Sequence, residues 1–360
     1  MKIVFAGGGT AGHIEPALAS ARQWIAENPE SQLLFLGTPE GLETQLVPAA
    51  GFELALISKV RIPRKISSQL FKVPASLLKS FSQCRAILQG ADLLIGFGGY
   101  VSGPAYIAAK FSGVPIVIHE ANAKPGLANR LGALFTQYLA VAQPIESGPF
   151  TKALITGLPL RKDIEHALLA SAGNWNKARS SAKRSLGFNE KLPLVLVTGG
   201  SQGSVAINKC IADSLEVFAT KQIQIFHSVG GRNDLPTSTE LYKSTAYISD
   251  MATAYLAADL IISRSGAVTC SEVGALGKYA LFIPLPIGNG EQEVNTRSLV
   301  EAGRAEVISQ KSFSREWLTA NIDRLLAKSA ARPAEGFDSD VHAAKKIVAL
   351  MQRAISGEQI

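Results

Sequence analysis

The sequence predicts an α/β fold with two Rossmann-like domains whose parallel sheets face a cleft. Three observations predict it: a length of 360 residues, short β-branched runs that alternate with helical stretches, and glycine-rich turns after several of these runs. A chain of this length is about twice the usual size of one domain, so each half can bury a core of its own. Continuous apolar strands separated by helices are typical of parallel sheets that are covered on both faces.

The expected strands fall into two series along the chain. The first series is KIVFAG (2–7), QLLFLG (32–37), ELALI (53–57), LLIGF (93–97), PIVIHE (115–120) and QYLAVA (137–142). The second series is LVLVTGG (194–200), QIFHSVG (224–230), AYIS (246–249), LIISRSG (260–266) and YALFIPLP (279–286). A largely polar segment, residues 156–192, separates the two series, and we place the domain boundary near Leu160.

The chain ends in a helical pattern. After Pro333, the stretch FDSDVHAAKKIVALMQRAI predicts a terminal helix capped by Ser339 or Asp340. We assign this helix to the N-terminal domain, which then comprises residues 1–160 and 339–360, whereas the C-terminal domain comprises residues 161–338. The Asp338-x-Asp340 spacing is more typical of capping than of metal binding, so we expect no metal there.

Composition narrows the class of protein. Apolar residues make up 47% and charged residues 18%, a globular balance that excludes disordered and collagen-like chains. No apolar run reaches the ~18 residues of a membrane span, and no charged leader precedes the first strand, so we expect a protein kept in the cytoplasm. Cys84, Cys210 and Cys270 lie far apart without metal-ligand spacing and are expected to be reduced thiols.

The net charge of +7 predicts an acidic partner. Nucleic acid is not expected, because the most basic stretch contains only Phe71 and Phe81 as aromatic residues and no recognised binding module.

The turn after the first strand, GGGTAGH (7–13), has the Gly-x-Gly-x-x-Gly spacing of a dinucleotide site. Such a site also needs an acidic residue at the end of the second strand to hold the adenosine ribose. That strand ends in Gly37-Thr38-Pro39, and Glu40 lies beyond the proline, so NAD and FAD are not expected. A similar turn, TGGSQGS (198–204), follows the first strand of the second half, and both turns expose backbone N–H groups that suit an anion.

The loop GFGGYVSGP (96–104) is a further candidate binding turn. Gly98 and Gly99 let the backbone approach a ligand, and Tyr100 and Ser102 add hydroxyl groups. The alternative is a tight turn between a strand and a helix, without a ligand.

His119, Glu120 and Asn122 follow a buried strand, at the edge where open α/β sheets bind ligands. Neighbouring side chains of an extended chain point to opposite sides, so His119 and Glu120 are not expected to form a dyad. One of them is expected to face the ligand while the other braces the loop.

The segment RSGAVTCSE (264–272) repeats the strand, turn and helix design in the second half. We expect Thr269, Ser271 and Glu272 in the first turn of the helix that follows Gly266. Glu272 then either accepts hydrogen bonds from the hydroxyls of a ribose or acts as a capping residue.

Between Leu54 and Ala91 the chain contains no Asp or Glu. The basic residues there are Lys59, Arg61, Arg64, Lys65, Lys72, Lys79 and Arg85, and apolar residues at near-helical spacing are Ile66, Leu70, Val73, Leu77, Phe81, Cys84 and Leu88. A basic amphipathic segment can lie on an anionic lipid surface. Alternatively, the apolar stripe packs on its own sheet and only the charges meet water.

Eight motifs spread over nearly the whole chain carry a family resemblance. In order, they are GGGTAGHIEPALA, GGYVSGP, HEAN, GLPLR, GGSQGS, ISDMATAY, RSGAVTCSE and GNGEQEVN. Together they resemble glycosyltransferase family 28, and within it the bacterial N-acetylglucosaminyltransferases that make lipid II. The resemblance implies the glycosyltransferase B fold, with the donor held mainly by the C-terminal domain and the acceptor by the N-terminal domain.

The implied reaction moves N-acetylglucosamine from UDP-N-acetylglucosamine to the C4 hydroxyl of the muramoyl sugar of undecaprenyl-diphosphoryl-MurNAc-pentapeptide, with inversion to a β linkage. The resemblance implies no metal and no cofactor. Other classes remain open: a UDP-sugar 2-epimerase, a glycosyltransferase acting on diacylglycerol, and a non-catalytic nucleotide-sugar-binding scaffold at the membrane.

The resemblance also implies the substrate-binding residues. They are Thr10, Ala11 and Gly12 at the donor sugar and diphosphate, with Asn122 and Arg161 beside them, Ser201 at the diphosphate, Ile248 at the uracil, Ala267, Val268, Thr269, Cys270, Ser271 and Glu272 at the diphosphate and ribose, and Gln292 at the sugar hydroxyls. Two positions depart from the family pattern. Ala11 replaces a common glycine, and Glu291 replaces the first glutamine of a Gln-Gln pair, which puts a sugar contact by Glu291 in doubt.

Inverting transfer needs a base for the acceptor hydroxyl and a clamp for the charge on the departing UDP. His13 is the first candidate base, because imidazole titrates near neutrality, and His119 and Glu120 are the reserve candidates. Alternatively, His13 only orients its loop or binds the acceptor. Arg161, the backbone of Ser201 and the helix after Gly266 are expected to form the clamp.

A lipid-linked acceptor favours the membrane interpretation of the basic segment, with the enzyme bound peripherally at the cytoplasmic face of the cell membrane. The expected contacts with the anionic surface are Lys65, Leu70, Lys72, Leu77, Lys79 and Phe81, and the expected acceptor-binding residues are Gly98, Gly99, Tyr100 and Ser102.

Overall fold

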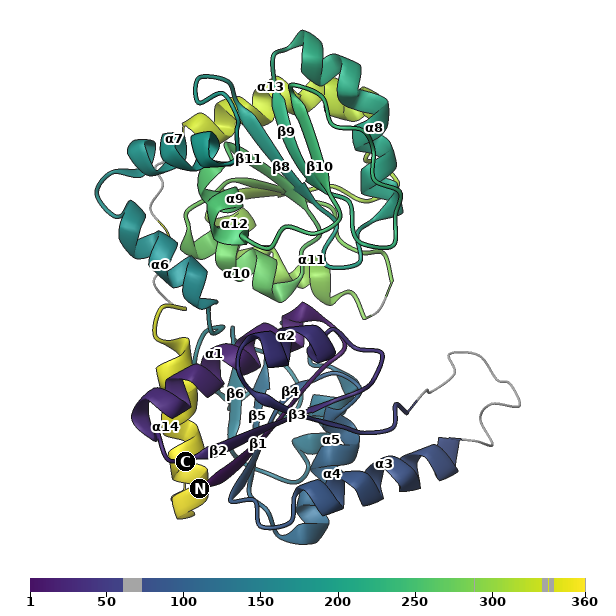
Figure 1. Ribbon diagram of the computed structural model, residues 1–360, viewed down its shortest axis with the longest axis vertical. Coiled ribbons are helices and arrows are strands. Elements are labelled where there is room, and N and C mark those ends of the chain that lie inside the picture. Colours follow the sequence, from purple (N-terminus) through teal and green to yellow (C-terminus); the bar gives the residue numbers. More distant parts are fainter. Residues whose placement is uncertain (61–72, 288, 332–335, 337–339, 360) are drawn as a thin grey trace. The chain divides into compact units, whose positions relative to one another are not determined.

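The computed structural model describes residues 1–60, 73–287, 289–331, 336 and 340–359. The chain forms two compact units. The N-terminal unit comprises Met1–Arg161 and Ser339–Ile360, and the C-terminal unit comprises Lys162–Asp338. Each unit is an α/β layer structure around one parallel sheet (Figure 1).

The sheet of the N-terminal unit has the strand order β3-β2-β1-β4-β5-β6-β7. Its strands are β1 (Lys2–Gly7), β2 (Gln32–Gly37), β3 (Glu53–Leu56), β4 (Leu93–Gly98), β5 (Ile116–Glu120), β6 (Leu139–Val141) and β7 (Leu154–Ile155). The register places Phe5 opposite Phe35, and these two rings stack with centroids 4.9 Å apart. The order reverses between β1 and β4, and open α/β sheets bind their ligands at such a point.

Helices cover both faces of this sheet. They are α1 (Ala11–Glu27), α2 (Glu43–Ala49), α3 (Val73–Ile87), α4 (Ser102–Ser112), α5 (Leu127–Gly132) and α14 (Ala343–Ser356). Alternate residues of β1 point to opposite faces. Ile3 and Phe5 pack in one core with residues of α1 and α14, whereas Val4 packs in the other core with residues of α3 and α4. Figure 1 shows α14 beside α1, so the end of the chain completes the N-terminal unit.

The C-terminal unit repeats the design with the strand order β10-β9-β8-β11-β12-β13. Its strands are β8 (Leu194–Thr198), β9 (Gln224–Ser228), β10 (Tyr242–Thr245), β11 (Leu260–Ser263), β12 (Ala280–Phe282) and β13 (Ala305–Val307). Its helices are α6 (Lys162–Ser171), α7 (Trp175–Ser185), α8 (Val205–Thr220), α9 (Met251–Ala257), α10 (Ala267–Ala275), α11 (Glu291–Asn295), α12 (Arg297–Glu301) and α13 (Arg315–Ala330). The order reverses between β8 and β11, which puts the expected ligand edge at the carboxyl ends of these two strands.

Three expectations about elements were wrong. The strand expected at 246–249 lies instead at β10, a polar edge strand, while Ala246 and Tyr247 are exposed. The short strands β7 and β13 were not expected. Asp340 does not cap α14: its Oδ1 accepts a hydrogen bond from Leu158 N at 3.0 Å, whereas His342 is the N-cap residue. Ser339, the other expected cap, lies outside the described residues.

Candidate functional site

Three loops gather at one edge of the N-terminal sheet. They follow the neighbouring strands β1, β4 and β5, which end at Gly7, Gly98 and Glu120. Because the strands are parallel, their carboxyl ends meet at the same edge. Three of the predicted motifs are therefore brought together within this unit.

The turn after β1 is built around glycine and held by a buried carboxylate. Gly9 has a φ of +90°, in the left-handed region that favours glycine. Glu43, at the start of α2, is 1% exposed and its Oε2 accepts from Gly9 N at 2.8 Å. Its Oε1 accepts from Thr38 N at 2.8 Å. Sequence reasoning missed Glu43, because its partner Gly9 lies 34 residues away.

His13 lies in the first turn of α1, directly after this glycine turn. Its Nδ1 lies 3.2 Å from Gly8 O and 3.2 Å from Thr10 Oγ1. Burial lowers the pKa of His13, and the negative charges of Glu120 and Glu43 and the bond to Gly8 oppose this shift. The side chain is therefore a neutral imidazole at pH 7.

The turn after β4 packs directly against the first turn. Gly98 and Gly99 have φ values of +92° and +86°. A Cβ on Gly99 would lie 2.3 Å from Gly8 O and 3.2 Å from His13 Nδ1, so a larger residue does not fit. The two glycines thus serve both the backbone conformation and the close approach of the turns.

The hydroxyl groups of this second turn differ in their surroundings. Tyr100 is 56% exposed, and Lys59 Nζ lies 5.3 Å from its ring centroid. Ser102 is fully buried, and its Oγ lies 2.9 Å from Ala6 O and 2.8 Å from Gly98 O. The expectation that Ser102 offers its hydroxyl to a ligand does not fit this arrangement, because the hydroxyl ties the turn to β1.

The reserve bases both serve the interior of the unit. His119 is fully buried, its Nε2 lies 3.0 Å from Gly157 O, and burial lowers its pKa to about 4. Glu120 is 3% exposed, and it accepts hydrogen bonds from Asn122 N at 2.9 Å, Gly126 N at 2.9 Å and Asn129 Nδ2 at 3.0 Å. Glu120 therefore braces the loop after β5, whereas His119 ties β5 to the backbone at Gly157.

Five other predicted residues belong to the N-terminal unit: Thr10, Ala11, Gly12, Asn122 and Arg161. Asn122 donates through Nδ2 to Glu120 Oε1 at 3.1 Å, which fixes its side chain beside the loop. Thr10 is the N-cap residue of α1, and Ala11 and Gly12 open that helix. Arg161 is half-buried and directly precedes α6.

In the C-terminal unit, the turn after β8 opens α8. Gly200 and Gly203 have φ values of +86° and +74°, and Ser201 between them is half-buried. Ser204, the N-cap residue of α8, accepts from Ile207 N at 3.4 Å. Backbone N–H groups at the start of this 16-residue helix suit an anion.

The turn after β11 carries an unsatisfied hydroxyl. Ser265 is fully buried, and its Oγ has no hydrogen-bond partner among the described residues. Gly266 is the N-cap residue of α10, and no side chain of the described residues caps that helix. A buried polar group without a partner is costly unless a ligand or water satisfies it.

The position expected for Glu272 was wrong. The first turn of α10 carries no acidic residue, because the helix begins at Ala267 and Glu272 is its sixth residue. Glu272 is 3% exposed. Glu272 is therefore not an N-terminal capping residue of α10, so the capping interpretation is excluded. The other predicted residues of α10 that are partly buried are Ala267, Val268, Thr269 and Ser271. Cys270 is buried, and burial raises the pKa of its thiol.

Arg264 ties the two turns of the C-terminal unit together. This buried guanidinium donates to Ser204 Oγ at 2.7 Å and to Ile283 O at 2.9 Å. It also donates to Gln310 Oε1. Sequence reasoning missed Arg264 because these partners lie up to 60 residues away.

Three further predicted positions lie on other loops of this unit. Ile248 is 5% exposed and precedes α9. Gln292 lies in α11, and its Oε1 accepts from Leu285 N at 3.0 Å, so part of its side chain is already engaged. Glu291 Oε2 is buried without a hydrogen-bond partner among the described residues.

The segment expected to meet a membrane is described only in part. Lys65, Leu70 and Lys72 lie outside the described residues. Leu77 and Phe81 are half-buried, and Phe81 packs against the core that contains Cys84 and Leu88, as the alternative interpretation expects.

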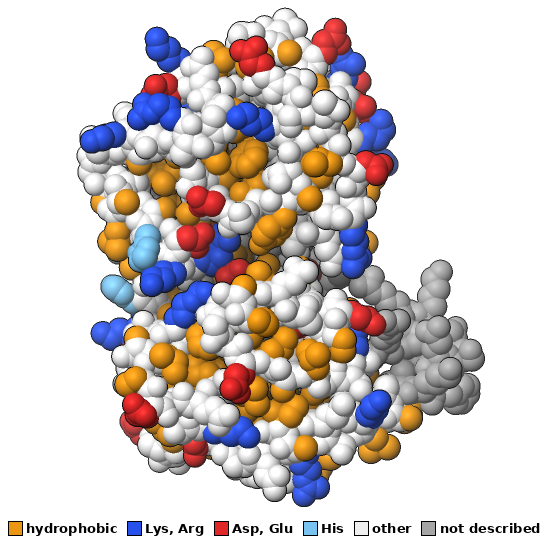
Figure 2. All heavy atoms as spheres, in the orientation of Figure 1, with side chains coloured by type: hydrophobic (Ala, Val, Ile, Leu, Met, Phe, Trp, Pro, Cys, Tyr) orange, Lys and Arg blue, Asp and Glu red, His pale blue; other side chains and the backbone are white. Residues whose placement is uncertain are grey.

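Two other apolar side chains are exposed, one on α3 and one on the neighbouring helix α4. Leu78 of α3 is 68% exposed and Phe111 of α4 is 74% exposed. Lys79 and Lys110, their neighbours in the chain, are exposed as well. Figure 2 shows hydrophobic and basic side chains next to each other on the surface of this unit. No helix among the described residues is long and apolar enough to cross a membrane.

Comparison of the sequence with models of known protein families shows which family of proteins the chain belongs to. The glycosyltransferase family 28 N-terminal domain matches residues 3–141, and the family 28 C-terminal domain matches residues 194–351. The chain belongs to glycosyltransferase family 28. Its sequence is 42% identical over 97% of the chain to the UDP-N-acetylglucosamine–N-acetylmuramyl-(pentapeptide) pyrophosphoryl-undecaprenol N-acetylglucosamine transferase of Thermobifida fusca, 94% of which is covered. The protein of the same name from Streptomyces coelicolor is 43% identical over 91% of the chain and 90% of that protein.

Solved structures agree on the fold of this family 28 chain. The crystal structure of Acinetobacter baumannii MurG has a TM-score of 0.68 at 27% identity and covers 98% of this chain, with 99% of that chain covered. The UDP-GlcNAc 2-epimerase of Neisseria meningitidis has the same TM-score, 0.68, at 15% identity, with 98% and 100% covered. The second likeness shows the fold alone, so the fold does not separate transferase from epimerase. Sequence similarity along the whole chain does.

Proposed function

We propose that this family 28 glycosyltransferase moves N-acetylglucosamine from UDP-N-acetylglucosamine to the C4 hydroxyl of MurNAc in undecaprenyl-diphosphoryl-MurNAc-pentapeptide. The observation that carries the proposal is the identity of 42% to a transferase of that name over 97% of the chain. The proposed reaction inverts the anomeric centre and forms a β linkage. It places the protein in peptidoglycan synthesis.

The donor is bound by the C-terminal turns in this proposal. Ser201 and the start of α10, from Ala267 to Ser271, offer N–H and hydroxyl groups to the diphosphate. The free Oγ of buried Ser265 supports an acceptor-rich ligand at this turn. Glu272 receives the ribose hydroxyls, the backbone of Ile248 meets the uracil, and Gln292 contacts the sugar.

The base is His13. Its Nδ1 lies next to the Gly8 carbonyl, so the proton resides on Nδ1 and the lone pair on Nε2. Nε2 then takes the proton from the C4 hydroxyl as that oxygen forms its bond to C1 of the donor sugar. The bond from C1 to the diphosphate oxygen breaks, and UDP leaves with the electron pair. The low pKa of His13 keeps the imidazole neutral before the reaction.

The charge on departing UDP is stabilised by protein dipoles and cations in this proposal. Thr10, Ala11 and Gly12 supply the helix N-terminus of α1, and Arg161 and Asn122 supply charged and polar side chains. N–H groups that are already oriented need no rearrangement as charge develops. The proposed chemistry uses no metal ion and no cofactor.

The acceptor is bound by the turn after β4 and by the nearby helices. Gly98 and Gly99 leave the backbone accessible, and Tyr100 presents an exposed ring with a hydroxyl group. The lipid tail remains in the cytoplasmic leaflet, and the protein binds that surface peripherally. Among the described residues, the proposed contact with the lipid surface consists of Leu78, Phe111, Lys79 and Lys110.

A turnover assay separates this proposal from its alternatives. Purified protein is incubated with UDP-N-acetylglucosamine, with and without a short-chain analogue of the muramoyl lipid. UDP release that requires the analogue is the expected result. UDP-N-acetylmannosamine formed without acceptor would identify a 2-epimerase, release with diacylglycerol would identify a lipid glycosyltransferase of another kind, and no turnover would leave a binding scaffold.

A further inference from the structure

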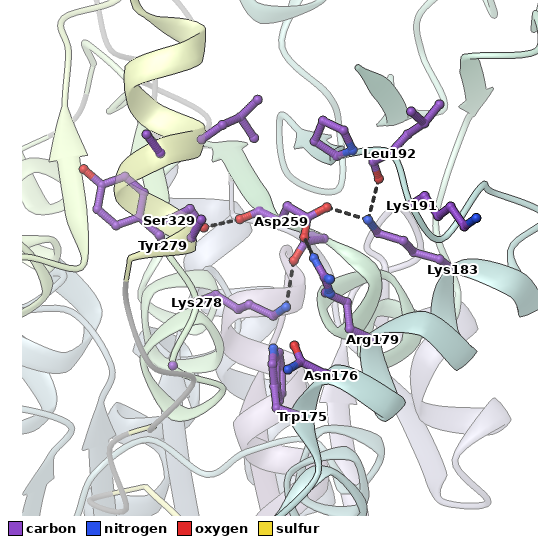
Figure 3. Close-up of a pocket in the computed structure, with 16 residues that line it drawn as sticks. Trp175, Asn176, Arg179, Lys183, Lys191, Leu192, Asp259, Lys278, Tyr279 and Ser329 are labelled. Atoms are coloured by element: carbon purple, nitrogen blue, oxygen red, sulfur yellow. Dashed lines mark hydrogen bonds and ion pairs between the residues drawn. The ribbon is translucent and has the colours of Figure 1, made fainter. Parts of the chain in front are cut away.

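A hollow lies in the C-terminal unit, away from the turns described above. It has a volume of about 530 Å³. The segments that line it directly precede β8, β11 and β12, together with α7 and α13 (Figure 3). It is therefore at the amino-terminal edge of the sheet, opposite the turns that follow Thr198 and Ser263. Strands of four or five residues separate the two edges by about 15 Å.

The lining is strongly cationic. Its ionisable side chains other than tyrosine are Arg179, Lys183, Lys191, Lys278 and Asp259. Four basic groups and a single carboxylate thus line the cavity. Sequence reasoning did not predict this cluster, because its members come from four separate segments of the chain.

Asp259 fixes two of the four cations. Lys183 Nζ donates to Asp259 Oδ2 at 2.6 Å, and Arg179 forms an ion pair with Oδ1. Oδ2 also accepts from Leu194 N at 2.8 Å, so the carboxylate is committed. Arg179 Nε is buried and has no hydrogen-bond partner among the described residues.

Two of the four cations that line the cavity, Lys191 and Lys278, have no carboxylate at hydrogen-bond distance among the described residues. Lys278 is the more buried of these two. It is 6% exposed. Its Nζ donates to Ala258 O at 2.7 Å and to Leu256 O at 3.1 Å, and it lies 4.1 Å from the ring centroid of Trp175. Burial lowers the pKa of Lys278 well below its usual value; the charge of Asp259 opposes this shift, and Arg179 and Lys183 add to it. Two backbone carbonyls and the ring of Trp175 thus hold Nζ of Lys278 in place on the wall of the cavity.

We propose that this cavity binds a small phosphomonoester. Its volume is in the range of small-molecule sites. Guanidinium and ammonium groups are the usual partners of phosphate oxygens. A phosphate group carries two charges and three free oxygens, so it can meet both the guanidinium of Arg179 and Nζ of Lys278, which lie on the same side of the cavity, whereas Lys191 points outward and adds a longer-range attraction (Figure 3). Trp175 forms an apolar wall for the organic part of the ligand.

The test is a titration followed by tryptophan fluorescence, with Trp175→Phe to assign the signal. Saturating UDP is present throughout, so that the proposed donor turns are occupied. The probes are glycerol 3-phosphate, inorganic phosphate and succinate, with glycerol as the uncharged reference, at constant ionic strength. Saturable binding of glycerol 3-phosphate is expected, at least as tight as that of inorganic phosphate and tighter than that of succinate.

Two charge reversals decide where the probe binds. Lys191 is exposed and lines the cavity, so Lys191→Glu should fold and weaken binding at least tenfold. Lys177 is exposed on the same helix as Arg179 but does not line the cavity, so Lys177→Glu should bind as the wild type does. Equal losses in both variants, no saturable binding, or succinate binding as tightly as the phosphates would each overturn the proposal.

Discussion

Nδ1 of His13 lies 3.2 Å from the carbonyl oxygen of Gly8, within the glycine turn that follows β1. A carbonyl oxygen can only accept a hydrogen bond, so Nδ1 carries the proton and Nε2 keeps its lone pair. The backbone of the turn therefore sets the tautomer that a general base needs. Gly99 closes against the same turn, where a Cβ would lie 2.3 Å from Gly8 O.

Replacing His13 tests the base. His13→Ala is expected to lower turnover by about 10² to 10⁴, because it removes the group that accepts the proton. UDP binding should remain nearly unchanged, as measured by calorimetry. Near-normal turnover would exclude His13 as the base.

The pH profile of the wild type gives a second readout for His13. Its pKa is lowered in the folded protein, so the imidazole becomes protonated only below the usual value of 6.5. The acid limb of kcat/KM is therefore expected below pH 6.5, and activity should fall as pH decreases through that limb. An acid limb above pH 6.5 would contradict this assignment.

Glu43→Gln tests the support of the glycine turn. An amide places an NH₂ group against the backbone N–H groups of Gly9 or Thr38, so the turn should shift and kcat should fall at least tenfold. The charge of Glu43 also raises the pKa of His13, so its loss should move the acid limb of the pH profile to lower pH.

A matched control for Glu43 lies close in the sequence. Glu40 is an exposed carboxylate whose Oε2 lies 3.7 Å from Lys59 Nζ. Glu40→Gln should leave both kcat and the acid limb unchanged. A Glu43→Gln variant that loses stability but keeps the wild-type limb would mean that Glu43 only supports the fold.

Glu272→Ala tests the ribose contact. Loss of a charged acceptor is expected to weaken UDP binding by about ten- to hundred-fold. A UDP analogue without the 2′ hydroxyl should bind the wild type less well but respond little to the mutation. Calorimetry of both ligands with both proteins forms a double-mutant cycle. Additive losses would contradict the contact, and the exposed Glu301→Ala is the control that should bind UDP normally.

Lipid binding is tested on the exposed pair of α3 and α4. Leu78→Asp combined with Phe111→Asp is expected to release the protein from anionic vesicles, because each removes an apolar contact and adds like charge. Activity on a soluble acceptor analogue should remain. Lys152→Glu, at another exposed site of the same unit, is the charge control. Unchanged vesicle sedimentation in the double variant would show that another face binds lipid.

The central strands of both sheets were predictable from the sequence, because they are apolar on both faces. β1 and β8 match their expected runs. The edge strand β10 was not predicted, since its sequence YKST is polar and only Tyr242 is buried. Short pairings such as β7 depend on a neighbouring strand and leave little local signal.

The candidate site was predictable to the extent that it depends on glycine. The turns at Gly9 and Gly98 require positive φ, and this requirement is visible in the spacing. The roles of Glu43 and Arg264 were not predictable, because each acts through partners that are distant in the chain. The position of Glu272 was missed because the start of α10 determines which turn it occupies.

The most direct test of the proposed reaction follows the anomeric carbon itself. UDP-N-acetylglucosamine labelled with ¹³C at C1 is incubated with the protein and the muramoyl lipid analogue, and the products are examined by NMR. We expect the label to appear in a β-linked disaccharide only when the acceptor is present, and His13→Ala to slow its appearance. Label that remains in a UDP-sugar epimerised at C2, or that enters an α linkage, would contradict the proposed reaction.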